Sequence, residues 1–136
     1  MHKLSLQLFI SFICVFNSSI AYPKQCLNVF AYINWFGFTI NAITLNPPLE
    51  MKQADSFVAG SGYDYQVRYQ TKISPAGDVV LVTQLKGLVD DCQEPVTRTY
   101  KAETRKSYDG GELVCGTNAY QLYINVNGIV EREACE

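Results

Sequence analysis

The sequence predicts a small exported domain that is rich in β-hairpins and cross-linked by two disulfides. The first residues have the pattern of an export signal, the remaining chain contains four cysteines, and the segment from Tyr63 to Ile73 alternates strictly between two kinds of side chain. An even number of cysteines in a short exported chain is typical of a disulfide framework. Strict alternation is typical of a strand with one buried face. At 136 residues the chain is long enough for one compact domain and too short for two ordinary ones.

The export signal is expected to occupy residues 1–21. Lys3 supplies a basic start, a mostly apolar run follows it, and Ser19 and Ala21 are the small residues that a signal peptidase reads. The apolar run is shorter than the roughly 20 residues that a membrane span needs. We therefore expect cleavage after Ala21, a secreted protein with a single domain over residues 22–136, and no association with a membrane after cleavage.

Charge and histidine content exclude several classes of function. The 11 basic and 13 acidic residues give a formal net charge of −2, without the basic excess that binding to nucleic acid requires. The only histidine, His2, lies in the export signal, so the mature chain has no imidazole for base catalysis or metal binding. The sequence therefore predicts no enzyme, no metal site, no cofactor and no nucleic-acid partner. Four cysteines remain after cleavage, and three pairings are possible for them: Cys26, Cys92, Cys115 and Cys135.

The clearest element is a hairpin in the middle of the chain. Its first strand is Tyr63 to Ile73 and its second strand is Val79 to Leu88. A three-residue loop over Pro75 to Gly77 places Ile73 opposite Val79 and keeps apolar residues opposite apolar residues along the pair. Pro at the first loop position and Gly at the left-handed position are what this hairpin type requires.

Two further β elements are expected towards the C-terminus. Residues 120–125 and 129–135 predict a second hairpin with its turn at Val126 to Gly128, because this register keeps the glutamates opposite other polar or aromatic residues. Residues 98–106 are polar and compatible with a strand, and predict an exposed or edge strand. Its basic residues could form an anion patch, although Lys and Arg that keep a sheet edge soluble explain them more simply.

The pattern of residues 26–45 leaves helix and strand both open. Apolar residues at helical spacing occur on two opposite sides, while β-branched and aromatic residues are abundant. A helix that is apolar all round is a buried one, and a pair of buried strands has the same composition.

Several short motifs resemble the cystatins. Residues 57–63 read Phe-Val-Ala-Gly-Ser-Gly-Tyr, which is similar to the first inhibitory loop of that family, commonly written Q-V-V-A-G. Phe30 and Ala31 precede this segment by the same interval as a Phe-Ala pair in the central helix of many secreted cystatins. Cys115 and Cys135 have the separation of the last cystatin disulfide.

The resemblance implies an α+β fold in which an antiparallel sheet wraps around one N-terminal helix at residues 27–41. It also implies the disulfides Cys115–Cys135 and Cys26–Cys92. The implied function is a secreted, reversible inhibitor of papain-like cysteine proteases that inserts an apolar wedge into the active-site cleft. The wedge residues would be Ser56, Phe57, Val58, Ala59 and Gly60 in the first loop, Val126, Asn127 and Gly128 in the second, and Tyr22 and Pro23 at the N-terminus. Gly60 would allow the main chain to approach the protease closely.

The contact loops depart from the family pattern, and other interpretations stay open. Ser56 stands where the family has Gln, and Val126 and Asn127 stand where many members have Pro-Trp. A non-inhibitory cystatin-like extracellular binding protein is therefore an alternative. An all-β immunoglobulin-like sandwich is another, and it predicts a Cys26–Cys115 bridge. A small-ligand carrier lined by tyrosines is a third alternative. We expect a monomer.

Overall fold

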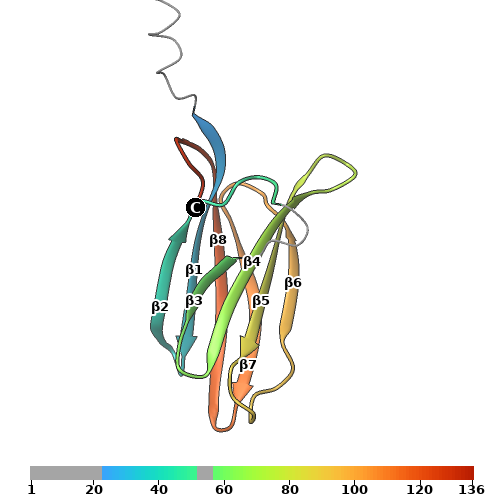
Figure 1. Ribbon diagram of the computed structural model, residues 1–136. Coiled ribbons are helices and arrows are strands. Elements are labelled where there is room, and N and C mark those ends of the chain that lie inside the picture. Colours follow the sequence, from blue (N-terminus) through green and yellow to red (C-terminus); the bar gives the residue numbers. More distant parts are fainter. Residues whose placement is uncertain (1–22, 52–56) are drawn as a thin grey trace, which may run out of the picture.

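The computed structural model describes residues 23–51 and 57–136 (Figure 1). Within these residues the chain forms strands and turns and no helix. The strands are β1 (Lys24–Trp35), β2 (Phe38–Leu45), β3 (Phe57–Ser61), β4 (Tyr65–Ile73), β5 (Val79–Gly87), β6 (Val96–Lys101), β7 (Lys106–Cys115) and β8 (Asn118–Arg132).

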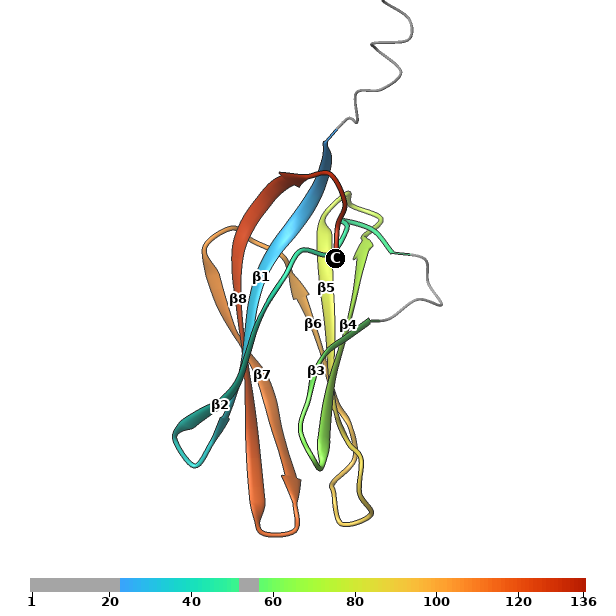
Figure 2. The same cartoon turned by 60° about the vertical axis from the view of Figure 1, so that its left-hand side comes forward.

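The strands form two antiparallel sheets that pack face to face (Figure 2). The first sheet has the order β2-β1-β8-β7 and joins the hairpins β1–β2 and β7–β8 through the pairing of β1 with β8. The second sheet is the meander β3-β4-β5-β6. The chain thus leaves the first sheet after β2, builds the whole second sheet, and returns to the first sheet with β7.

Alternate residues of each strand fill the space between the sheets. On β1, Leu27, Val29, Ala31 and Ile33 are buried, and the residues between them are half-buried. Leu122 and Ile124 of the neighbouring strand β8 continue this buried layer in the same sheet, and Leu81 and Leu85 of β5 lie opposite in the second sheet. Each such side chain contributes about 1.5–3 kcal/mol through removal of apolar surface from water. The core therefore explains why the period along these segments is two.

Residues 27–41 form most of β1, a two-residue turn and the start of β2, so the predicted α+β, cystatin-like fold around an N-terminal helix is wrong, and the all-β alternative agrees with the structure. The helical spacing was misleading because it mixed the two faces of β1. Leu27 and Ala31 point into the core, whereas Phe30 and Asn34 lie on the outer face. Strand β1 has aliphatic residues on its buried face and aromatic rings on its outer face, so it is largely apolar on both sides. A buried helix has the same property, and the spacing alone does not distinguish the two.

The central hairpin is confirmed with its predicted register. Ile73 pairs with Val79, Tyr69 with Thr83 and Val67 with Leu85. Gly77 occupies the left-handed position at φ 87°, and its N–H donates to the carbonyl of Ser74 at 2.9 Å. The hairpin was predictable because its alternation and its turn chemistry lie within one short segment.

The predicted hairpin over residues 120–125 and 129–135 is wrong. Residues 126–128, predicted as a turn, lie inside the continuous strand β8, where Val126 is buried and pairs with Val29. Asn127 is accommodated as a bulge between the pairs Asn28–Gly128 and Val29–Val126. The predicted strand over residues 98–106 is also divided. Its first part is β6, which is an edge strand as expected, and its last residue begins β7 after a turn.

The disulfides are Cys26–Cys135 and Cys92–Cys115. Both predicted bridges, Cys115–Cys135 and Cys26–Cys92, are therefore wrong, as is the Cys26–Cys115 bridge of the immunoglobulin-like alternative. The observed pairing follows from the topology. Cys26 lies on β1, and Cys135 follows the neighbouring strand β8, while Cys92 forms an isolated bridge with Cys115 at the end of β7.

Candidate functional site

The structure does not bring the predicted protease-contact segments together. Residues 57–60 belong to strand β3 and pair with β4 in the second sheet, instead of forming a hairpin tip. Residues 126–128 belong to β8 in the first sheet, and Val126 is buried. Pro23 is exposed just before β1, whereas Ser56 and Tyr22 lie outside the described residues. These segments therefore form no common edge among the residues that the structure describes.

A different feature is present at the end of the sandwich that carries the β1–β2 and β3–β4 turns. Large apolar side chains gather there and are exposed to solvent: Phe36 by 61%, Phe38 by 69%, Ile40 by 45% and Tyr63 by 93%. We call these four residues and the half-buried Trp35 the aromatic end. Contiguous apolar groups exposed on a small protein mark a contact surface for another molecule. The strand predicted to begin at Tyr63 begins at Tyr65, and Tyr63 is exposed in the turn that precedes it.

The tip of the aromatic end is a two-residue turn with unusual chemistry. Phe36 and Gly37 connect β1 to β2 with φ angles of 48° and 83°, both in the left-handed region. This turn type favours Asn-Gly because Asn and Gly tolerate positive φ. A phenylalanine there costs about 1–2 kcal/mol, and its ring regains little by burial because most of it is exposed. The fold therefore carries a strained and exposed aromatic residue at the tip of the β1–β2 hairpin.

Trp35 connects this tip to the rest of the molecule. Its indole Nε1 donates a hydrogen bond to Oδ1 of Asn118 at 3.1 Å. Its ring also meets the ring of Phe36 edge-to-face, with 5.0 Å between centroids. Such a pair adds roughly 0.5–1.5 kcal/mol to the burial of the two rings. Trp35 thus links the tip to β8, because its indole N–H is bonded to Asn118 and its ring contacts Phe36.

An open cleft lies beside the tip, between the two sheets. Its volume is about 340 Å³, and it is lined by Trp35, Ile40, Tyr63, Asp64, Asn118 and Tyr120. The first two residues come from the β1–β2 hairpin, the next two from the β3–β4 turn, and the last two from the start of β8. We call this opening the end cleft. It forms because β2 and β3 belong to different sheets and their hairpins reach the same end of the sandwich (Figure 1).

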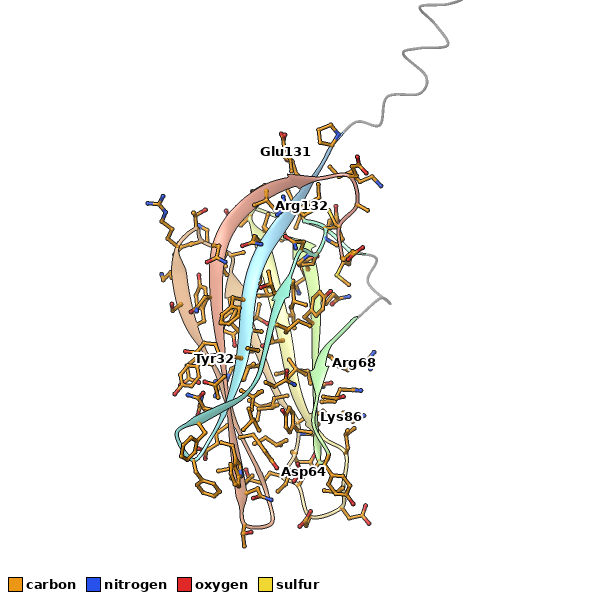
Figure 3. The ribbon with its side chains drawn as sticks, turned by 90° about the vertical axis from the view of Figure 1, so that its left-hand side faces the viewer. Tyr32, Asp64, Arg68, Lys86, Glu131 and Arg132 are labelled. Atoms are coloured by element: carbon orange, nitrogen blue, oxygen red, sulfur yellow. A yellow bond between two sulfur atoms is a disulfide. The ribbon has the colours of Figure 1, made fainter. Side chains whose placement is uncertain are left out.

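The floor of the end cleft is a buried carboxylate. Asp64 is only 8% exposed, and the hydroxyl of Tyr120 donates to its Oδ1 at 2.6 Å. Burial of Tyr120, together with this hydrogen bond, raises the pKa of its phenol far above the ordinary value. The main chain is also held, because the N–H of Leu88 donates to the carbonyl of Asp64 at 2.9 Å. Figure 3 shows Asp64 at the end of the molecule opposite Glu131 and Arg132.

The loop beside the aromatic end is acidic, and strand β5, which leads into this loop, exposes one basic residue, Lys86. Residues 27–49, which include all of the β1–β2 hairpin beyond Cys26, contain no Asp, Glu, Lys, Arg or His. The loop between β5 and β6 reaches the same end and exposes Asp90, Asp91 and Glu94. This acidic loop is fixed by the Cys92–Cys115 disulfide and by the N–H of Gly116, which donates to the carbonyl of Asp91 at 3.0 Å. The end therefore combines apolar rings with an anionic rim.

The sequence did not reveal the aromatic end because four of its five residues lie in residues 26–45, the segment that could be helix or strand. One signal was present. Residues 35–38 read Trp-Phe-Gly-Phe inside a long stretch without charge, and a glycine between aromatic residues is compatible with a tight hairpin. The cleft itself left no such signal, because its lining residues come from three separate parts of the chain.

Comparisons with protein-family models, with curated proteins and with solved structures found no match. In residues 23–51 and 57–136, no group of three or more His, Cys, Asp or Glu side chains is arranged to hold a metal ion. The same part of the chain has no helix long and apolar enough to cross a membrane. The functional argument therefore rests on the geometry of the aromatic end.

Proposed function

We propose that this chain is a secreted, non-enzymatic binding module that docks on a protein partner through its aromatic end. The observation that carries the proposal is the exposure of Phe36 at a strained turn, next to the exposed rings of Phe38 and Tyr63. Buried aromatic anchors contribute a large share of the energy of protein interfaces, often 2 kcal/mol or more each. A strained and exposed aromatic residue is explained if its ring becomes buried in a pocket of the partner.

The charges favour a protein partner over a membrane surface. Segments that lie on membranes usually place Lys and Arg beside their apolar residues, so that they attract anionic lipids. Here the apolar hairpin has no basic residue, and the neighbouring loop contributes Asp90, Asp91 and Glu94. A partner surface with an apolar pocket and a basic rim complements this end.

Secretion is part of the proposal and has two supports. Disulfides persist in oxidising compartments such as the extracellular space, and the structure contains two of them. The export signal predicted for residues 1–21 agrees with that location.

Inhibition of a papain-like protease stays a prediction from sequence. The geometry favours the broader binding function, because residues 57–60 lie within a strand and residues 126–128 lie within another sheet. The non-inhibitory binding protein is therefore the interpretation that we carry forward.

The test compares two pairs of substitutions at opposite ends of the molecule. Phe36→Ser with Phe38→Ser removes two rings from the aromatic end, and Ile73→Ser with Ile129→Ser removes exposed apolar groups, 37% and 52% exposed, from the other end. Extracellular fluid of the source organism is passed over the immobilised mature chain and both variants. Each retained protein is then purified and its Kd is measured by surface plasmon resonance.

We expect the phenylalanine variant to bind the partner about 100-fold more weakly, and the isoleucine control to change the Kd less than threefold. A partner that both variants bind equally would place the interface elsewhere. Binding of the mature chain to phosphatidylcholine vesicles with loss in the phenylalanine variant would show a membrane surface instead. Stoichiometric inhibition of papain would support the protease interpretation.

A further inference from the structure

We infer that the end cleft binds a primary ammonium group, and that in the docked state this group is the side chain of a lysine on the partner. The inference rests on the proposed function, because it names the chemistry that the partner presents to the aromatic end. Its support is the composition of the cleft, the direction of its hydrogen bonds and the charge of the neighbouring loop.

The composition of the cleft is that of a cation site. Trp35, Tyr63 and Tyr120 contribute aromatic rings, and Asp64 contributes a carboxylate. The faces of aromatic rings carry negative potential and attract ammonium groups within about 6 Å of the ring centre. The alkyl part of a lysine side chain is apolar and can lie along Ile40 at the mouth of the cleft. The ammonium group and the alkyl part of a lysine side chain are therefore both complementary to the residues that line the cleft.

The hydrogen bonds inside the cleft leave acceptors facing it. The O–H of Tyr120 is engaged by Asp64, and the N–H of Trp35 is engaged by Asn118. A carboxylate has about four acceptor positions, and one of those on Asp64 is occupied by Tyr120. An ammonium group carries three donors and no acceptor, so it complements a cleft in which these two donors are already paired.

Volume and charge agree with a small cation. A cleft of about 340 Å³ is at the lower end of the size of ligand sites, which suits one side chain better than a large cofactor. The acidic loop with Asp90, Asp91 and Glu94 adds negative potential at the same end. An anionic ligand would meet repulsion from Asp64 and from this loop.

The chain contains its own reporter for this site. Trp35 is the only tryptophan in the sequence, and its indole lines the cleft. Its emission therefore reports occupancy when the mature, disulfide-bonded chain is titrated with Nα-acetyl-lysine N-methylamide. The norleucine counterpart of this probe keeps the alkyl stem and lacks the ammonium group. Tetramethylammonium tests whether a quaternary ammonium is preferred.

We expect saturable quenching by the lysine probe in the millimolar range, and binding of the norleucine probe at least tenfold weaker. Asp64→Asn keeps an acceptor for Tyr120 and should weaken binding of the lysine probe at least tenfold. Tyr63→Ala should weaken it about threefold to tenfold, and it serves as a second variant because Tyr63 is 93% exposed and contributes little to folding. Glu131→Gln, at an exposed acid of the opposite end of the molecule (Figure 3), is the matched control and should change binding less than twofold.

Equal binding of the lysine and norleucine probes, or binding unchanged in both Asp64→Asn and Tyr63→Ala, would overturn the inference. Binding of tetramethylammonium tenfold tighter than the lysine probe would overturn the assignment to lysine and indicate a quaternary ammonium ligand. These results are independent of the docking test. The inference can fail while Phe36→Ser with Phe38→Ser still weakens docking on a protein partner, and the proposed function fails if that loss of docking is not observed.

Discussion

The two ends of the sandwich are built from the same kind of tight connection between antiparallel strands, yet they expose different side chains. At the end that carries the termini, the turns hold ion pairs. Lys101 lies 3.6 Å from Asp78, and Lys106 lies 2.7 Å from Glu103. The left-handed positions there are Gly77 and Arg105, a small residue and a charged one. At the aromatic end the left-handed positions are two glycines, Gly37 and Gly116, and one large apolar residue, Phe36.

This difference separates what folding requires from what the proposed docking would require. Both ends satisfy the geometry of their turns, so the fold alone does not require a phenylalanine at position 36. Glycine and polar residues at such positions are the ordinary solution for a turn that faces water. The departure from that solution at one end, together with a cleft, is the reason to place the interface there.

The first prediction concerns the removal of one disulfide from each end of the molecule. Cys26→Ala with Cys135→Ala opens a link between residues 109 apart, and Cys92→Ala with Cys115→Ala opens a link between residues 23 apart. Loop-closure entropy predicts losses of about 5 and about 3 kcal/mol in the free energy of unfolding, respectively. Urea unfolding of both variants measures these values.

For docking we expect the opposite order: loss of the Cys92–Cys115 bridge should weaken docking more than loss of the Cys26–Cys135 bridge. The Cys92–Cys115 bridge fixes the acidic loop beside the end cleft, so its loss should weaken partner binding in molecules that are still folded. The Cys26–Cys135 bridge lies at the other end and should leave binding of the folded fraction unchanged. If the Cys26–Cys135 variant lost more docking than the Cys92–Cys115 variant, the proposal that docking depends on the aromatic end alone would be contradicted.

The second prediction concerns the floor of the end cleft. Tyr120→Phe removes the hydroxyl that donates to Asp64, and the loss of a hydrogen bond to a buried charged group should lower stability by about 1.5–3 kcal/mol at neutral pH. The pKa of Tyr120 is raised in the folded state above the ordinary value of 10.0. The folded state therefore resists ionisation of this phenol, and the stability that it contributes is present below pH 10 and lost as the pH rises above it.

Urea unfolding of wild type and Tyr120→Phe at pH 8 and at pH 11 tests this prediction. The difference in the free energy of unfolding between the two proteins should be smaller at pH 11 than at pH 8, because only the wild type has a phenol at position 120 to ionise on unfolding. Tyr69 and Tyr100, whose pKa values are also raised by burial, are present in both proteins and cancel in the comparison. A gap that widens with pH would contradict the role given to the Tyr120 hydroxyl.

The parts of the fold that could be predicted from sequence are those with local causes. The central hairpin has its alternation and its Pro-Ala-Gly loop within a few residues, and its register was predicted correctly. The C-terminal turn was not, although Asn127 and Gly128 are strong turn residues. Val126 instead continues a strand because it pairs with Val29, almost a hundred residues earlier in the chain. A long-range pairing that buries Val126 outweighs a local turn preference.

The site was harder to predict than the fold because each of its parts depends on that long-range pairing. The end cleft exists only when the β1–β2 hairpin, the β3–β4 turn and the start of β8 reach the same end. The Phe36–Gly37 turn was hidden for a different reason. Its residues contradict the usual chemistry of a two-residue turn, so a search for good turn sequences passes over it.

The third prediction concerns the phenylalanine at a left-handed turn position, and it has the smallest expected change in the free energy of unfolding. Phe36→Asn places a residue that tolerates positive φ at the tip of the aromatic end, so it should raise the free energy of unfolding by about 1 kcal/mol. The same change should weaken docking at least tenfold, because the ring is lost. Thermal and urea unfolding measure the first effect, and the Kd for the partner measures the second.

Arg105→Asn is the matched control at the other end, because Arg105 is also a non-glycine residue at positive φ, with φ 60° against 48° for Phe36. It should stabilise the protein by a similar amount, since the same backbone strain is relieved. It should leave docking unchanged, because Arg105 lies in the β6–β7 turn, far along the sandwich from the aromatic end (Figure 1). If both substitutions stabilise the chain and only Phe36→Asn impairs docking, the strain at Phe36 is maintained for binding. If Phe36→Asn stabilises the chain and docking is retained, the phenylalanine ring is not the anchor, and the interface must be sought away from this turn.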